Sequence, residues 1–200
     1  MNNNLKEAIM NRRSIYSLSN KSLISDEEIV EIVNFAVKHV PSPFNSQSAR
    51  VVVLFGENHT KLWNIVKKTL RKFTPAEKFP ATEKKIEESF ASGYGTIMFF
   101  EDQSVVKNLE TSFPTYADNF AIWSLESSGM HQFAVWVMLE NAGFGASLQH
   151  YNPLIDDEVR KTWKIDPNWK LIAEMPFGVP TAKPGEKQFQ PLENRVKIFF

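Results

Sequence analysis

The chain has 200 residues, and its 23 lysines and arginines balance its 23 aspartates and glutamates, so the formal net charge is zero. Nucleic-acid binding relies on an excess of basic residues that neutralise phosphates, and the charge balance disfavours that class of function. The absence of cysteine excludes disulfide frameworks, thiolate metal sites and cysteine nucleophiles. No segment has the apolar length of a signal peptide or a membrane span, which predicts a cytoplasmic protein without a membrane partner.

Two helices are predicted at the start of the chain. Apolar residues recur at helical spacing across Leu5–Arg12, which places Arg12 on the inner face near the C-terminal end of the first helix. Ser25 and Glu28 have the spacing of a capping box at the start of the second helix. Pro41 and Pro43 end that helix, because proline lacks the amide hydrogen and disfavours helical geometry in the residue before it.

Two short apolar runs, at 49–56 and 95–102, are predicted to be buried strands. The first run ends at a glycine, and the second ends at a pair of acidic residues. Between and after these strands we expect helices at 57–73, 81–92 and 102–113.

The longest predicted helix is Asn119–Asn141. Met130 and Phe133 repeat at helical spacing on one side, while Trp136 and Leu139 make the opposite side apolar too. A helix that is apolar nearly all round must be covered on all sides. This pattern predicts either the core helix of the domain or part of a dimer interface.

The rest of the chain is predicted to alternate strands and helices after Gly143 ends the long helix. We expect a strand at 144–149, a helix at 152–163, a strand at 169–180, a polar connection at 182–195 and a terminal strand at 196–200. The complete pattern predicts an α+β fold, a sheet covered by helices, in one domain that spans residues 1–200.

The first candidate site is Arg12, Arg13 and Ser14, at the end of the first helix. A guanidinium offers a planar set of donors that suits a phosphate, and the serine adds a hydroxyl. Taken alone, the same residues also fit a solvated basic helix end that complements the helix dipole.

The loop before the first long strand is unusually rich in amides and hydroxyls. Asn45 and Gln47 each carry a donor and an acceptor, so they can bind the edge of a heterocycle that mixes carbonyl and N–H groups. The alternative is a turn in which Ser42 and Asn45 cap their own backbone.

Two further groups of polar residues follow later in the chain. Gln149 and His150 come directly after a short strand, and Lys183 and Lys187 lie in the polar connection near the end. A lone histidine is most often a structural hydrogen-bonding residue, and exposed lysines are usually solvated. No other histidine has metal-ligand spacing to His150, and no phosphate-loop, dinucleotide or nucleophile-elbow motif is present, so no metal site is expected.

Taken in their order along the chain, these motifs resemble the FMN-dependent nitroreductase family. The resemblance covers nearly the whole chain, and the segments SPFNSQSARVVVL and ASLQHYNP resemble one subfamily of small bacterial members and fungal relatives linked to fatty-acid regulation and oxidative stress. The residues that carry it are Arg12-Arg13-Ser14, the loop Pro41–Gln47, Asn141-Ala142-Gly143 at the end of the long helix, and Gly178-Val179-Pro180 with Lys183 and Lys187.

The resemblance implies an α+β homodimer with a central, mostly antiparallel sheet and a long helix in the interface. It implies two FMN sites between the subunits and a ping-pong reaction. NADH or NADPH reduces the flavin and leaves, and a nitroaromatic or quinone acceptor then takes the electrons in the same pocket. Because the flavin carries the hydride chemistry, no side chain is assigned a catalytic role.

The same resemblance assigns roles to the candidate residues. Arg12, Arg13 and Ser14 hold the FMN phosphate, assisted from the tail by Lys187 and Lys183.

Other candidates are assigned to the rest of the flavin. Asn45 and Gln47 bind the ring edge and the ribityl chain, and Ser42 orders their loop. Gln149 and His150 contact the ring from the other subunit.

Two departures from the family pattern are visible. Lys187-Gln188-Phe189 stands where many members have Lys-x-Arg, and FGASLQHYN replaces a Gly-rich or Trp-containing strand. The phosphate contacts from the tail and the shape of the substrate pocket therefore stay open. Two alternatives also stay open: a flavin-binding sensor with little turnover, and a ligand-free structural dimer.

Overall fold

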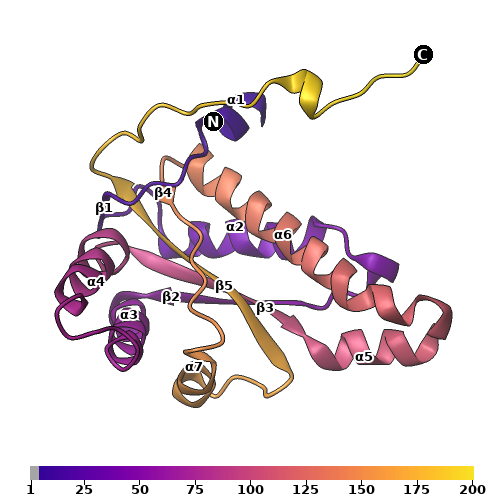
Figure 1. Ribbon diagram of the computed structural model, residues 1–200, viewed down its shortest axis with the longest axis horizontal. Helices are drawn as coiled ribbons and strands as arrows, with labels where there is room; N and C mark the ends of the chain where they lie inside the picture. Colours follow the sequence, from indigo (N-terminus) through magenta and orange to yellow (C-terminus); the bar gives the residue numbers. More distant parts are fainter. Residues whose placement is uncertain (1–4) are drawn as a thin grey trace.

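A five-stranded antiparallel sheet forms the centre of the molecule (Figure 1). The computed structural model describes residues 5–200, so the first four residues of the predicted domain lie outside it. The strand order is β1-β5-β3-β2, and β4 pairs with β5. The strands are β1 (Leu18–Ser19), β2 (Ala49–Phe55), β3 (Gly95–Asp102), β4 (Gly145–Ala146) and β5 (Trp169–Pro180). The predicted α+β class and antiparallel sheet are confirmed.

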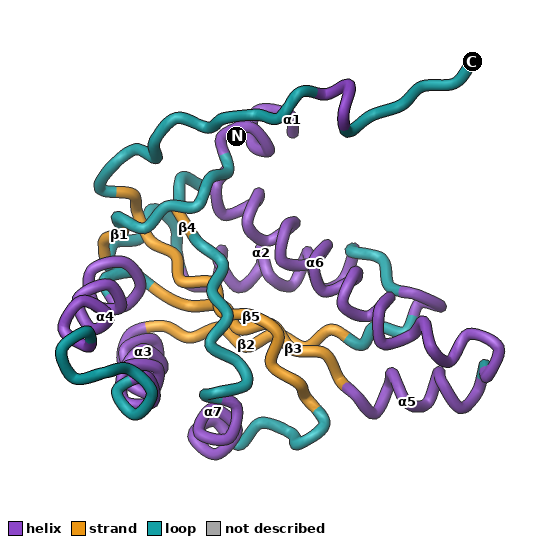
Figure 2. The backbone as a smooth tube through the Cα atoms, in the orientation of Figure 1, coloured by secondary structure: helices purple, strands orange, loops and turns teal. Residues whose placement is uncertain are grey.

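Helices cover both faces of the sheet (Figures 1 and 2). Strand β3 is buried along its whole length, with Ile97 and Phe99 in the core beneath α2 and α6, and Met98 and Phe100 in the core beneath α3 and α7. Its central residues, 97–100, are apolar on both faces because the sheet is covered on both sides. The helices are α1 (Leu5–Asn11), α2 (Asp26–His39), α3 (Gly56–Leu70), α4 (Phe79–Ile86), α5 (Gln103–Ser112), α6 (Ala117–Asn141) and α7 (Asp156–Trp163).

Most predicted elements agree with the structure within a few residues. The capping box before α2 is present, since Ser25 and Glu28 each accept a backbone N–H from the other, at 3.2 and 2.9 Å. Helix α4 continues into a π-helical turn at Glu87–Ala91. Strand β1 was not predicted, because two residues are too few to give an alternating pattern.

Helix α6 buries five polar residues in its middle turns and exposes large apolar residues on its outward side. Ser124, Ser127, Ser128, His131 and Gln132 are buried against the rest of the chain. The buried hydroxyls and ring are satisfied within the fold, for example by Ser127, which donates to the carbonyl of Pro41 at 3.0 Å. The large apolar residues on the outward side are Ile122, Leu125, Met130 and Phe133. One chain therefore does not cover this helix on all sides.

The predicted terminal strand at 196–200 is wrong for the single chain. Residues 181–200 are exposed, and their regular structure is limited to a 3-10 turn at Leu192–Asn194. Figures 1 and 2 show this arm passing α1 and leading away from the sheet. The apolar end, with Val196, Ile198 and Phe199 exposed, reaches no strand edge of its own chain and so gains no ladder hydrogen bonds.

Candidate functional site

Arg12 and Arg13 follow α1 and form a cationic centre without a carboxylate partner among residues 5–200. The guanidinium of Arg12 lies 4.5 Å from the ring centroid of Trp136 on α6, and its buried Nε has no hydrogen-bond partner. Desolvation, and then the nearby charge of Arg13, lower the pKa of Arg12. An anion placed here would compensate for the desolvation of Arg12 and for the repulsion between the two guanidinium groups.

The tail lies against this cationic centre. Arg13 donates from Nη2 to the carbonyl of Gly185 at 2.9 Å, and Gly185 lies between Lys183 and Lys187. Both lysines are exposed and make no ion pair in the described chain. The Nζ atom of Lys187 lies 5.2 Å from the ring centroid of Phe189. The structure thus brings the predicted tail residues to the same end of the molecule as the arginines.

Ser14 lies beside the segment that carries Gln149. It forms a parallel bridge with Ala146 of β4, and Ile15 donates its N–H to the carbonyl of Ala146 at 2.9 Å. Gln149 donates from its side chain to Ser147 at 3.0 Å, and His150 is exposed. One chain therefore joins the segments of Ser14 and Gln149, which favours a contribution of Gln149 and His150 from the chain of Ser14, while the expected contribution from the other subunit stays a prediction.

The loop with Asn45 and Gln47 has an unusual backbone. Phe44, Asn45 and Gln47 have φ values of 55°, 52° and 50°, in the left-handed region that side chains other than glycine rarely adopt. Such residues cluster at functional sites, where the surrounding structure holds them in place. The side-chain amides of Asn45 and Gln47 are exposed and have no hydrogen-bond partner in the described part of the chain.

Ser42 holds this loop in shape, as expected. Its Oγ accepts the backbone N–H of Gln47 at 2.9 Å, and the carbonyl of Ser42 accepts the N–H of Asn45 at 3.0 Å. Arg50 closes the other side by donating to the carbonyl of Gln47 at 2.8 Å and pairing with Asp102 at 3.0 Å. The loop presents its two amides outward from a fixed frame.

The arginines and the amide loop lie at different positions along α6. Arg12 stacks on Trp136, whereas the ring of Phe44 packs 5.4 Å from the ring of Phe120. Phe120 and Trp136 are sixteen positions apart on α6, which is about 24 Å along a helix axis. One chain therefore does not bring these two predicted groups together.

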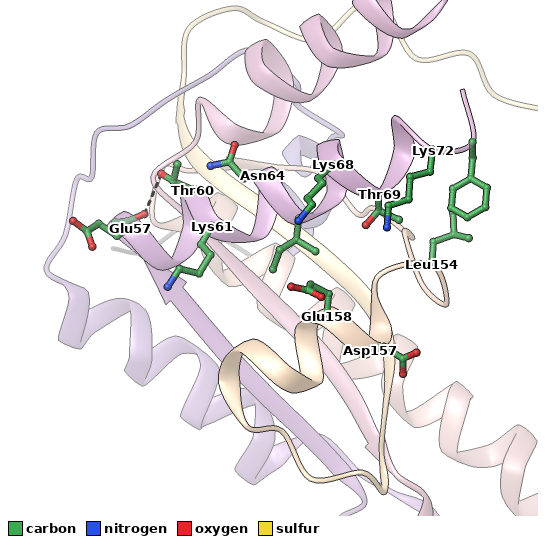
Figure 3. Close-up of a pocket in the computed structure, with 13 residues that line it drawn as sticks. Glu57, Thr60, Lys61, Asn64, Lys68, Thr69, Lys72, Leu154, Asp157 and Glu158 are labelled. Carbon is green, nitrogen blue, oxygen red and sulfur yellow. Dashed lines mark hydrogen bonds between the residues drawn. The ribbon is translucent and has the colours of Figure 1, made fainter. Parts of the chain in front are cut away.

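The cavities of the single chain also indicate that the predicted residues do not form a complete site within one chain. The pocket beside Ser42 and Gln47 has a volume of about 160 Å³, below the roughly 300 Å³ at which small-molecule sites begin. A groove of about 840 Å³ lies elsewhere, between α3 and α7 (Figure 3). Its walls carry side chains of both signs, such as Lys61, Lys68 and Glu158, and none of the predicted site residues lines it.

Two fully buried glutamates were missed by the sequence analysis. Glu101 of β3 accepts a 2.6 Å hydrogen bond from Ser48, the residue after Gln47, and Glu174 of β5 accepts the backbone N–H of Tyr151 at 3.0 Å. Burial raises the pKa of Glu101 to about 7 and that of Glu174 to about 8. The available signal was a single acidic residue inside an apolar strand, as in the run Ala173-Glu174-Met175.

The raised pKa of Glu101 predicts a pH-dependent stability. The native carboxyl keeps its proton up to about pH 7, whereas the unfolded one loses it near its ordinary value of 4.5. Raising the pH between these values favours the unfolded state, with a slope on the order of 1 kcal/mol per pH unit from this group. Glu101→Gln should flatten the fall in unfolding free energy, measured by urea denaturation from pH 4.5 to 7. Glu77→Gln, at an exposed carboxylate, should leave the slope as in the wild type, and an equally steep slope in Glu101→Gln would contradict the assignment.

The sequence pattern that defines the nitroreductase family matches residues 9–179. The chain belongs to the nitroreductase family. A yeast nitroreductase relative covers almost the same length: putative nitroreductase HBN1 from Saccharomyces cerevisiae is 36% identical over 190 residues, which are 94% of this chain and 93% of the relative. This membership makes the chain a nitroreductase-type oxidoreductase.

Solved nitroreductase structures share the fold. CinD from Lactococcus lactis, in complex with chloramphenicol, matches with a TM-score of 0.88 and 40% identity, over 98% of this chain and 100% of CinD. CinD has also been solved with 4-nitrophenol. A putative nitroreductase from Desulfovibrio desulfuricans in complex with FMN matches with a TM-score of 0.71 at 17% identity, over 100% of this chain and 99% of that one, which shows a common fold. Within residues 5–200, no helix of this nitroreductase combines the length and apolarity needed to cross a bilayer.

Proposed function

We propose that the protein is an FMN-dependent NAD(P)H oxidoreductase that works as a homodimer and reduces nitroaromatic or quinone acceptors. The observation that carries this proposal is the uncompensated pair Arg12 and Arg13, beside Ser14 and the lysine-bearing tail. A desolvated guanidinium with an orphaned Nε fits a phosphate group. The FMN bound by a protein of the same fold is consistent with this choice of ligand.

Two observations support the homodimer in this proposal: the exposed apolar side of α6, and the distance between the arginines and the loop with Asn45 and Gln47. The outward side of α6 exposes Ile122, Leu125 and Phe133, which is the reverse of what a monomer surface favours. In a two-fold interface each surface patch meets its own copy in the opposite direction. The amide loop of one chain would then lie near the arginines of its partner, and together they would complete a site that neither chain forms alone.

Each residue group has a separate task in this site. FMN, when bound, supplies the hydride chemistry. Arg12, Arg13 and Ser14 bind the phosphate, with Lys183 and Lys187 adding positive charge from the tail. Asn45 and Gln47 of the partner orient the ring edge and ribityl chain through their free amides. Gln149 and His150 border the ring from the chain that holds the phosphate.

An aromatic cluster beside the amide loop fits flat acceptors. Phe44 lies with its ring centroid 4.7 Å from that of Phe113 and 6.1 Å from that of Tyr116, and all three side chains are exposed. Aromatic faces at these distances accept another ring by offset or edge-to-face packing. The complexes of CinD with 4-nitrophenol and chloramphenicol agree with nitroaromatic acceptors.

The absorbance spectrum tests the proposal. Protein incubated with FMN and desalted should keep flavin absorbance, and anaerobic NADH or NADPH should bleach it. Addition of 4-nitrophenol or a quinone should then restore the absorbance. A protein that retains no FMN would defeat the proposal, whereas retained FMN that neither nicotinamide bleaches would favour a flavin-binding sensor. The cytoplasmic location stays a prediction of the sequence alone.

A further inference from the structure

Glu174 is the one acidic residue in the long apolar strand β5 whose side chain is completely buried, with 0% exposure. Ala173 and Met175 on either side of it belong to the core beneath α2 and α6. Burying a carboxyl group is costly unless hydrogen bonds or loss of the charge compensate. The position therefore needs an explanation that packing does not supply.

The backbone and side chain of Glu174 together hold two residues of the segment after β4, Gln149 and Tyr151, on either side of His150. Its carbonyl accepts the N–H of Gln149 at 2.7 Å, and its own N–H donates to the carbonyl of Gln149 at 2.9 Å. Its Oε2 accepts the N–H of Tyr151 at 3.0 Å. His150 lies between these fixed points and is exposed. The next attachment, from Ser147 to the carbonyl of Pro176, is longer, at 3.3 Å.

The carboxyl can hold this position because it is neutral at ordinary pH. Burial raises its pKa to about 8, and the nearby charge of Asp156 acts in the same direction. Tyr151, which faces it, has its pKa raised to about 12 by burial and by the charge of Glu174. Lys170 and Arg160 act on Asp156 rather than on Glu174. A neutral acid still accepts a hydrogen bond through its carbonyl oxygen, so the clamp on Tyr151 costs no buried charge.

We propose that Glu174 is a positioning residue of the flavin site, which fixes the backbone at 149–151 so that Gln149 and His150 face the ligand beside Ser14. The inference rests on the proposed function, because it assigns the ligand to this edge of β4. Glu174 itself touches no ligand, since it is buried behind the segment that it holds. Its role resembles that of outer residues that orient the direct ligands of a cofactor.

Three variants separate this role from simple packing. Glu174→Gln keeps an acceptor for the N–H of Tyr151 and removes the titrating proton. Glu174→Leu keeps a side chain of similar size, makes it apolar and removes the acceptor for the N–H of Tyr151. Asp156→Asn is the matched control, because it removes the neighbouring negative charge and leaves the hydrogen bond to Tyr151 in place.

The first measurement is hydrogen–deuterium exchange of the amide of Tyr151 in protein without added FMN. We expect about tenfold or faster exchange in Glu174→Leu and exchange within a factor of a few of wild type in Glu174→Gln and Asp156→Asn. Unchanged exchange in Glu174→Leu would overturn the clamp, whether or not the protein binds flavin.

The second measurement is the Kd for FMN, by quenching of flavin fluorescence, together with the visible spectrum of the bound flavin. Glu174→Leu should bind about tenfold more weakly with an altered spectrum, and Glu174→Gln should restore both. A wild type that binds no FMN defeats the proposed function. A wild type that binds FMN, together with a Glu174→Leu variant of equal affinity and spectrum, defeats the positioning role alone.

Discussion

Replacing both Arg12 and Arg13 by alanine is expected to weaken FMN binding by roughly 10²- to 10⁴-fold, since a hydrogen bond to a charged group contributes about 1.5–3 kcal/mol. The reason is that both guanidinium groups lack a carboxylate in the described chain, so their charge is left for the phosphate. The loss should be specific to the phosphate: riboflavin, which has the same ring without it, should bind the variant and the wild type with similar affinity. Fluorescence titration with FMN and riboflavin measures both effects.

Arg71 provides the control for this double variant. Its guanidinium also stacks on an aromatic ring, 4.5 Å from Phe79, but it pairs with Glu83 far from the candidate site. Arg71→Ala should leave FMN affinity unchanged. Equal affinity of the Arg12, Arg13 double variant and the wild type for FMN would show that the phosphate lies elsewhere.

Leu125→Glu should convert the protein from dimer to monomer and abolish flavin binding together with dimerisation. Leu125 is 47% exposed on the outward side of α6, and a glutamate there would bring two like charges into the centre of an apolar interface. The fold of the single chain should persist, because the buried side of α6 is untouched. Sedimentation velocity reports the oligomeric state of the variant, and circular dichroism reports whether the chain is folded.

Leu154→Glu is a closely matched control for the interface variant. Leu154 is 48% exposed but lies in the α3–α7 layer, on the other face of the sheet. This variant should stay dimeric and bind FMN. A Leu125→Glu protein that remains a dimer would place the interface away from α6, and a monomer that still binds FMN tightly would contradict a shared site.

The sequence predicted the fold well where its patterns are long and local. The stripe of α2, its capping box and the apolar run of β3 are each fixed by neighbouring residues, and the structure agrees with them. The terminal strand at 196–200 was predicted from five apolar residues, but a strand needs a partner edge, which the segment's own sequence does not specify. The same holds for β1, whose two residues are set by their pairing with β5.

The candidate site was only partly visible in the sequence. Arg12, Arg13 and Ser14 were found because adjacent polar residues at a helix end form a local motif. The left-handed backbone of Phe44, Asn45 and Gln47 carries no residue signature, since asparagine tolerates it but phenylalanine does not favour it. The position of Gln149 relative to Ser14 depends on the pairing of Ser14 with Ala146 and of Gln149 with Glu174, long-range contacts that spacing does not reveal.

Each flavin site is expected to take its arginines from one chain and its amides from the other, and a mixing experiment separates this arrangement from a site within one chain. An Arg12→Ala, Arg13→Ala protein is mixed with an Asn45→Ala, Gln47→Ala protein, neither of which retains FMN alone. A mixed dimer of a two-fold interface then has one site with all four changes and one fully native site. After subunit exchange, about one quarter of all sites should recover FMN at wild-type affinity, as counted by flavin absorbance. If no site recovers although mixed dimers have formed, the two groups act within one chain, and the shared site is wrong.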